Sequence, residues 1–172
     1  MDILSLDLAR RVGWARGTAG KTPDSGSFEL GAPGGNVGLL AGELARRLVQ
    51  MRRDRGVPDL VIVERWIPLR ASVNDRSVEV ALRLNGACHA ILGGIYNVLI
   101  VEPAAATIRA AVCGKANAGT RAETKAMVVH SVVLRGLLPK NSVDDDRADA
   151  LAGWVWAESV YGKTAPKNFA LS

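Results

Sequence analysis

Residues 3–7 read Ile-Leu-Ser-Leu-Asp, a short apolar run that ends in an acid, and residues 60–64 repeat the pattern as Leu-Val-Ile-Val-Glu. A short apolar run of this kind is typical of a buried strand. In open α/β sheets, ligands bind beyond the carboxyl ends of the parallel strands. If the two strands are neighbours, Asp7 and Glu64 therefore meet at the edge of the sheet where a ligand is expected.

The pattern around these two runs supports that arrangement. Strands are expected at 3–8, 12–17 and 25–30 as an antiparallel meander, and Asn36 can cap a helix that runs to about Arg55. The strand at 60–63, a helix at 73–92 and a strand at 97–101 follow, and then helices at 104–112, 123–137 and 143–161. This order is that of the ribonuclease-H-like fold. We predict an α/β protein with a five-stranded mixed sheet of order 3-2-1-4-5, flanked by helices.

Length and composition fit one globular domain, which we place at 1–161 with a tail at 162–172. The chain has 172 residues, 48% of them hydrophobic, and a net charge of +5, which suits a polyanionic partner. Asp2 and Asp7 lie within the N-terminal apolar stretch, and acids there are unlike a signal peptide. With Cys88 and Cys113 as reduced thiols, we expect a cytoplasmic protein, of a bacterium or a phage-infected host, without membrane association.

A third acidic segment is Asp144-Asp145-Asp146-Arg147-Ala148-Asp149. Acids in a first helical turn favour the helix dipole, which accounts for Asp144 and Asp145. It does not account for Asp149, which lies among core-like residues and shares a helix face with Asp146. Two carboxylates side by side raise each other's pKa unless a cation lies between them.

Four acids, Asp7, Glu64, Asp146 and Asp149, are thus candidate metal ligands. Mg²⁺ prefers hard oxygen ligands, and two such ions about 4 Å apart can hold both oxygens of a phosphoryl displacement. For Asp7 or Glu64 alone, a solvated strand end or an ion pair, for example with Arg65, is the simpler interpretation. Their predicted adjacency favours the metal site.

The same residues resemble the RuvC family of Holliday junction resolvases. The resemblance extends from Asp2 to about Trp156 and is most specific in the acidic helix. The matching segments are Asp7 with 11–15 (Arg-Val-Gly-Trp-Ala), 61–64 (Val-Ile-Val-Glu), 146–152 (Asp-Arg-Ala-Asp-Ala-Leu-Ala), 101–103 (Val-Glu-Pro), 108–109 (Ile-Arg), 114–115 (Gly-Lys) and 123–125 (Glu-Thr-Lys).

The resemblance implies a homodimeric endonuclease that uses Mg²⁺ or Mn²⁺ and makes paired nicks in four-way DNA junctions. It matches the family's two basic residues near the scissile phosphate to Arg109 and Lys125. The sequence departs from the pattern where the family has an aromatic wedge, since both Trp66 and Ile67 are candidates there. This suggests a phage-type or otherwise divergent member, and the sequence identifies no helicase partner.

Other features bear on DNA binding and assembly. The candidates for DNA contact are Trp66, Arg70, Arg76, Arg83, Arg109, Lys115, Arg121 and Lys125. Small residues at Gly86, Ala87, Ala90, Gly93 and Gly94 suit a dimer interface, or alternatively packing against the chain's own sheet. Of Trp154 and Trp156, we expect one to pack internally and the other to be partly exposed or at a contact.

Three alternatives remain open. Another nuclease of the same superfamily is less favoured, because exonucleases carry an acid where this chain has Ala9, and ribonucleases H carry their glutamate on a helix. A non-catalytic DNA-binding module of this fold would be expected to lack one of the acids, and all four are present. A phosphotransferase of the actin and sugar kinase type needs two such domains, whereas 172 residues hold one.

Overall fold

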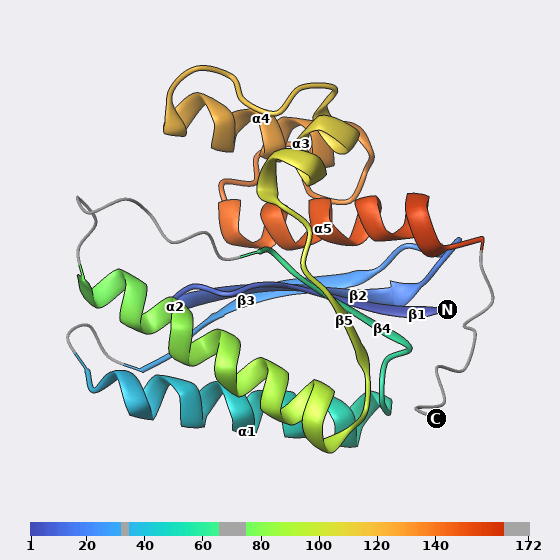
Figure 1. Ribbon diagram of the computed structural model, residues 1–172. Helices are drawn as coiled ribbons and strands as arrows, with labels where there is room; N and C mark the ends of the chain where they lie inside the picture. Colours follow the sequence, from blue (N-terminus) through green and yellow to red (C-terminus); the bar gives the residue numbers. More distant parts are fainter. Residues whose placement is uncertain (32–34, 66–74, 164–172) are drawn as a thin grey trace.

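The computed structural model describes residues 1–31, 35–65 and 75–163. Its five strands are β1 (Asp2–Asp7), β2 (Arg11–Thr18), β3 (Asp24–Glu29), β4 (Leu60–Val63) and β5 (Leu99–Val101). They form one sheet of order β3-β2-β1-β4-β5 (Figure 1). The predicted fold class and strand order are confirmed.

The register of the sheet brings the two acidic strand ends together. β1 lies in the centre, antiparallel to β2 and parallel to β4. Leu6 pairs with Val63; Asp7 is the last residue of β1, and Glu64 directly follows the last residue of β4. Asp7 and Glu64 therefore lie at the same edge of the sheet.

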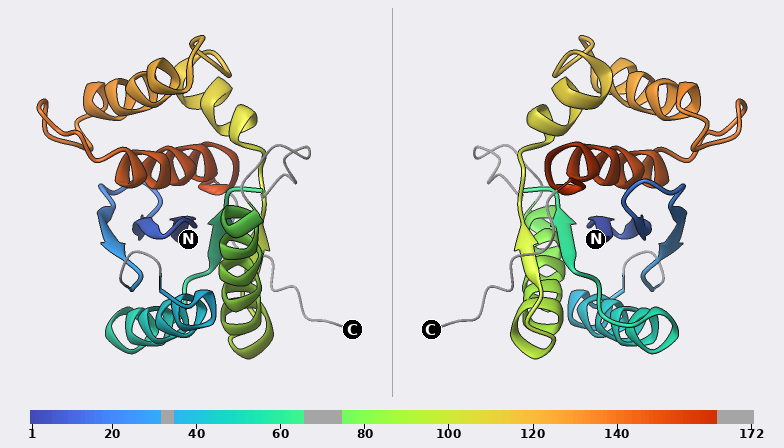
Figure 2. Two further views of the ribbon diagram at one scale, coloured as in Figure 1. Left: turned by 90° about the vertical axis from the view of Figure 1, so that its left-hand side faces the viewer. Right: turned by 90° about the vertical axis from the view of Figure 1, so that its right-hand side faces the viewer.

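Helices cover both faces of this sheet, in a single layer on one face and in two layers on the other (Figures 1 and 2). One face carries α1 (Val37–Arg55) and α2 (Asp75–Cys88), while the other carries α5 (Asp145–Tyr161), with α3 (Ala105–Cys113) and α4 (Arg121–Leu134) stacked outside it. The strands alternate between two cores. Leu4, Leu6, Val61 and Val63 face α1 and α2, whereas Ile3, Leu60 and Ile62 face α5.

Helix α5 is covered on two sides, by the sheet and by α3 and α4. Trp154 is 2% exposed and Trp156 9%, and both belong to the same core cluster. The expectation that one tryptophan would be partly exposed was therefore wrong. A helix between two layers can bury side chains around most of its circumference, so two residues on different faces can both be internal.

Some element boundaries differ from the prediction. The helix expected at 73–92 is α-helical only to Cys88 and continues as η1 (His89–Ile95), a π-helical segment with wider turns. Helix α4 begins before Glu123, because Thr120 and Glu123 form a reciprocal capping box. Asn36 caps α1 as expected, accepting from the Gly38 N–H.

None of the helices in the described part of the chain combines the length and apolarity needed to cross a membrane.

Candidate active site

The candidate site lies where β1, β4 and the first turns of α5 meet. Side chains alternate along a strand, so Asp7 faces the same side as Ile3 and Ser5, and Glu64 the same side as Leu60 and Ile62. That side is the one covered by α5. Figure 1 shows that α5 begins at the end of the sheet where β1 and β4 finish.

Two glycines allow α5 to approach the sheet closely. A Cβ on Gly13 of β2 would overlap the backbone carbonyl of Asp146, and one on Gly153 would overlap the Ser5 hydroxyl. Asp146 and Gly153 thus mark the line along which the helix rests on the sheet. Asp149 lies between them on the same face of the helix, near enough to the strand ends for its charge to raise the pKa of Asp7.

The electrostatics of Asp7 and Asp149 reflect this convergence. Burial raises the pKa of Asp7 well above its ordinary value, and the charges of Asp149, Glu64 and Asp146 raise it further, against an opposing effect of Lys125. Burial, followed by the charge of Glu64, raises the pKa of Asp149 to about 6. Asp7 is thus coupled to all three of the other predicted metal ligands.

The remaining two predicted ligands are more open to solvent. Glu64 is exposed, yet nearby protein atoms partly desolvate its carboxyl and raise its pKa, while Arg109 opposes the shift. Partial burial also raises the pKa of Asp146, as does the charge of Asp145, against the effects of Lys125 and Arg11. All four acids therefore hold a proton more readily than a free carboxyl does.

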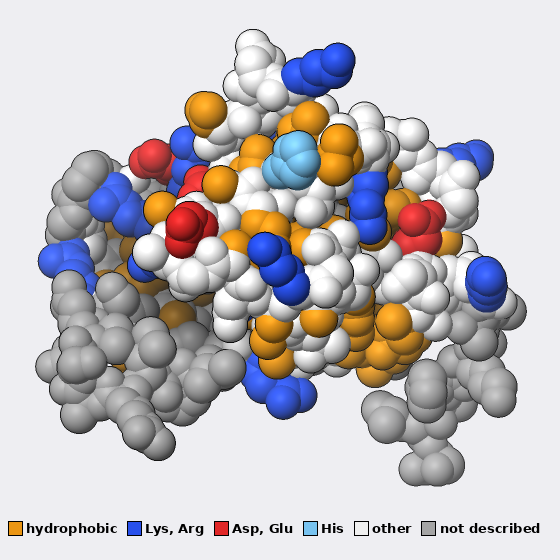
Figure 3. Space-filling model, turned by 90° about the horizontal axis from the view of Figure 1, so that it is seen from above, with side chains coloured by type: hydrophobic (Ala, Val, Ile, Leu, Met, Phe, Trp, Pro, Cys, Tyr) orange, Lys and Arg blue, Asp and Glu red, His pale blue; other side chains and the backbone are white. Residues whose placement is uncertain are grey.

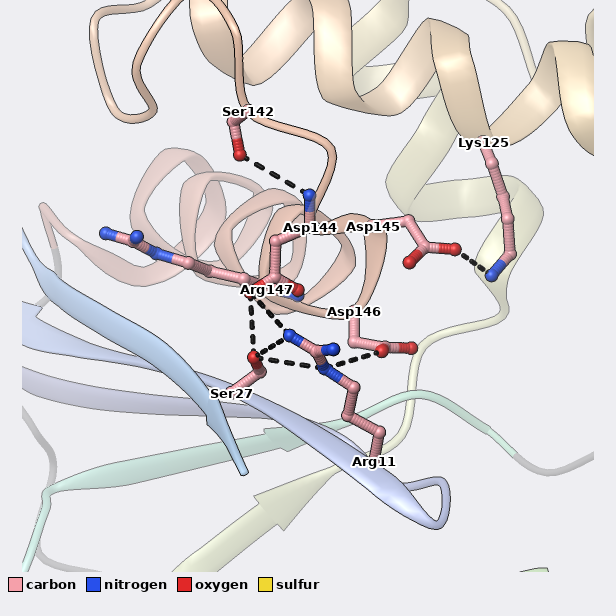
Figure 4. Close-up of polar contacts among 8 residues, drawn as sticks. All are labelled: Arg11, Ser27, Lys125, Ser142, Asp144, Asp145, Asp146 and Arg147. Atoms are coloured by element: carbon pink, nitrogen blue, oxygen red, sulfur yellow. Dashed lines mark hydrogen bonds and ion pairs between the residues drawn. The ribbon is translucent and has the colours of Figure 1, made fainter. Parts of the chain in front are cut away.

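Within the described residues, the consecutive Asp144, Asp145 and Asp146 each place a carboxylate oxygen within 4.8 Å of the other two. No three of the four predicted ligands, each in the described part of the chain, come that close. Asp144 and Asp146 both form ion pairs with Arg11, with N–O distances of 3.2 and 3.4 Å (Figure 4).

The charges of Lys125 and Arg109 act on the acids, and each side chain also has a partner of its own. Lys125 Nζ on α4 donates to the Asp145 carboxylate (Figure 4). This hydrogen bond raises the pKa of Lys125, so its charge is maintained. Arg109 Nε donates to the Ala116 carbonyl at 2.7 Å, and the Arg109 charge acts on both Glu64 and Asp149.

The other predicted DNA contacts are spread more widely. Lys115, Arg121 and Arg83 are exposed, and Arg83 pairs with Glu79 at 2.9 Å. Arg76 is exposed and donates to the Gly35 carbonyl at 2.9 Å. Trp66, Ile67 and Arg70 lie outside the described residues. Figure 3, which looks onto the α3–α4 side, shows basic side chains dispersed over the face rather than gathered in one patch.

The small residues of α2 and η1 divide between two environments. Gly86 and Ala90 are exposed, and a Cβ added at Gly86 would meet nothing within 4 Å. Gly93 is partly buried and lies toward Ile100 of the same chain. The predicted face is therefore available to a second copy at Gly86 and Ala90, but Gly93 packs against its own sheet.

Sequence reasoning missed three residues of the site. Asp145 was explained by the helix dipole, and Arg11 was quoted only for its place in a motif. Ser27 was not considered, although its hydroxyl donates to Asp144 at 2.7 Å. Nothing local to residue 27 indicates a partner 117 residues away. The only available signal was that Ser27 belongs to the strand expected to pair with the one containing Arg11.

The donor set fits a divalent cation. The four predicted ligands offer only oxygen atoms. Burial raises the pKa of each of them, and neighbouring acidic charges raise the pKa of Asp7, Asp146 and Asp149 further. Mg²⁺ and Mn²⁺ favour such hard oxygen ligands, and a bound cation would offset the like charges.

Comparison with solved structures places the fold. Thermus thermophilus RuvC in complex with a Holliday junction substrate matches with a TM-score of 0.70 at 16% identity, over 94% of this chain and 95% of that one. A second structure of Thermus thermophilus RuvC gives 0.63 at 17% identity, over 96% and 99% of the two chains. The yeast mitochondrial Holliday junction resolvase Ydc2 gives 0.61 at 11% identity, over 93% and 81%.

No protein-family model and no curated protein matches the sequence. At these identities the three likenesses show the fold, which is the ribonuclease-H-like fold of RuvC.

Proposed function

We propose that this protein is a metal-dependent endonuclease that cleaves Holliday junctions or related branched DNA by phosphodiester hydrolysis. The observation that carries the proposal is the convergence of Asp7, Glu64, Asp146 and Asp149 at one end of the sheet. Burial and the charges of the other three acids raise the pKa of Asp7 there. The fold supports it, since Holliday junction resolvases share this fold.

In this proposal the four acids hold Mg²⁺ or Mn²⁺, two ions in each site. When bound, such cations activate water and stabilise the charge on a leaving oxygen. Lys125 and Arg109 are the chain's own cations beside the acids, and we assign them to the non-bridging oxygens of the scissile phosphate. Asp145 keeps the Lys125 ammonium charged and directed along the site.

Branched DNA is the substrate class, and Arg76, Arg83, Lys115 and Arg121 are its proposed phosphate contacts together with Trp66 and Arg70. Paired nicks in a two-fold symmetric junction need two active sites related by the same symmetry, which a C₂ homodimer supplies. The exposed face of α2 and η1 at Leu82, Gly86 and Ala90 is the proposed contact, since Leu82 is 51% exposed and the two small residues permit close approach. Such an enzyme would act in the cytoplasm.

The test is cleavage of four-way, Y-shaped, flap and linear duplex DNA by the purified protein with Mg²⁺ or Mn²⁺. The proposal expects nicks in the four-way junction at least as fast as in the simpler branches, and little cleavage of the duplex. Cleavage of the duplex alone, or of none of the substrates, would contradict it.

A further inference from the structure

A hydrogen-bonded network connects the start of α5 to β2 and β3 (Figure 4). Arg11 is the first residue of β2, and its Nη2 reaches the Asp144 carboxylate at 3.2 Å and the Ser27 hydroxyl at 2.8 Å. Its Nε lies 3.4 Å from the Asp146 carboxylate and 3.2 Å from Ser27. The Arg11 guanidinium thus links its own strand β2 to Ser27 of β3 and to two acids at the start of α5.

Asp144 is the second junction of this network. Its Oδ1 accepts from the backbone N–H of Arg147 at 3.1 Å and so caps α5. Its Oδ2 accepts from the Ser27 hydroxyl at 2.7 Å and from Arg11. The cap of the helix is therefore fixed to the sheet through its other oxygen, which defines where the first turn begins.

We propose that Arg11 and Ser27 are positioning residues that set the place of Asp146 within the candidate metal site. The inference rests on the proposed function, because it gives Asp146 a ligand's role. Ser27 and Asp144 hold the guanidinium from one side, so its Nε is presented to Asp146 in one orientation. Ligand carboxylates need such partners to keep their orientation toward a metal.

The geometry requires an arginine. The planar guanidinium presents Nε and Nη2 along one edge, and here that edge serves Asp146, Asp144 and Ser27 together. A lysine retains the charge, but its single ammonium nitrogen lacks the planar edge that places Nε and Nη2 at two fixed positions, so we expect it to lose this geometry. Charge and positioning can therefore be separated by substitution.

The experiment is Mn²⁺ binding to the full chain, measured by isothermal titration calorimetry without DNA. Ser27→Ala and Arg11→Lys leave the charge of the site unchanged, and both should weaken Mn²⁺ binding by about ten-fold. The matched control is Ser25→Ala. Ser25 lies on the same strand and accepts from Arg147 Nε of α5 at 3.0 Å, and this hydrogen bond involves no carboxylate. Ser25→Ala should bind Mn²⁺ like the wild type.

Urea unfolding of each variant shows that the fold is retained, and Ser27→Ala removes too little to prevent folding. Wild-type affinity in both Ser27→Ala and Arg11→Lys would overturn the inference. An equal loss in Ser25→Ala would also overturn it, because helix docking in general would then be responsible. If either of these results is found and the wild type still cleaves branched DNA, the positioning role of Arg11 and Ser27 is excluded but the proposed function is not. A wild type that neither cleaves nor binds Mn²⁺ overturns the proposed function as well.

Discussion

Gly13 of β2 lies directly against the backbone carbonyl of Asp146 at the start of α5. Gly13 also pairs with Asp7 across the β1–β2 ladder. One glycine thus separates two of the predicted metal ligands, and its missing side chain lets the acidic turn of the helix approach the end of β1. The closeness of the acids depends on this absence of a Cβ.

Replacing Gly13 by alanine should therefore displace the first turn of α5. The new methyl group would overlap backbone rather than a flexible side chain, so we expect a loss of about 1–3 kcal/mol in the free energy of unfolding, measured with urea. Gly42→Ala on α1 is the control, because a Cβ there meets nothing within 4 Å. A Gly13→Ala protein as stable as the wild type would show that the approach is not tight.

Asp149→Asn should stabilise the protein at neutral pH in the presence of EDTA. Folding raises the pKa of Asp149 from 3.8 to about 6 through burial and the charge of Glu64. The protonated Asp149 carboxyl therefore favours the folded state. This contribution to the free energy of unfolding is fully present below the unfolded-state pKa, and it is lost as the pH rises through about 6. At pH 8 the asparagine avoids the buried charge, a gain of at most about 3 kcal/mol.

The measurement is urea unfolding at pH 5 and pH 8. The difference between Asp149→Asn and the wild type should be smaller at pH 5, where the wild-type carboxyl is largely protonated. A variant less stable than the wild type at pH 8 would mean that Asp149 forms favourable contacts that outweigh its desolvation.

The sheet could be predicted from the sequence because short apolar runs mark the strands, and the order of the elements along the chain indicates how the strands pair. Ile3 to Asp7 and Leu60 to Glu64 carried that information. The same reasoning could not place Arg11 against Asp144, since that contact spans 133 residues and depends on how α5 lies over β2 and β3. It also misjudged Trp156, because burial on the outer side of α5 depends on α3 and α4 stacking there.

Ala90→Trp, in η1, should weaken a dimer that uses the exposed face of α2 and η1. Ala90 is exposed in its own chain, so the bulky ring would disturb a partner rather than the subunit's core. Light scattering at micromolar concentration should show a dimer for the wild type and a lower mass for the variant. Ala111→Trp, at an exposed alanine of α3, is the control. A strictly monomeric wild type, with or without junction DNA, would exclude the dimer.

DNA affinity should fall steeply with salt, because phosphate contacts release counterions. Arg121→Ala, at an exposed position of α4, should weaken binding to all sequences and reduce the slope of log K against log salt by about 1. Arg53→Ala removes the same charge from α1, on the opposite face of the sheet, and should have little effect. A flat salt dependence of the wild type would contradict phosphate binding.

The central claim is that Asp7, Glu64, Asp146 and Asp149 form one metal site for cutting DNA. It is tested most directly by the cleavage rate of a four-way junction as Mg²⁺ is titrated, for the wild type and for Asp7→Asn. We expect no cleavage in EDTA, a rate that saturates with Mg²⁺, and a loss of at least about 100-fold in Asp7→Asn with junction binding retained. Cleavage in EDTA, or a near-wild-type rate in Asp7→Asn, would contradict the account.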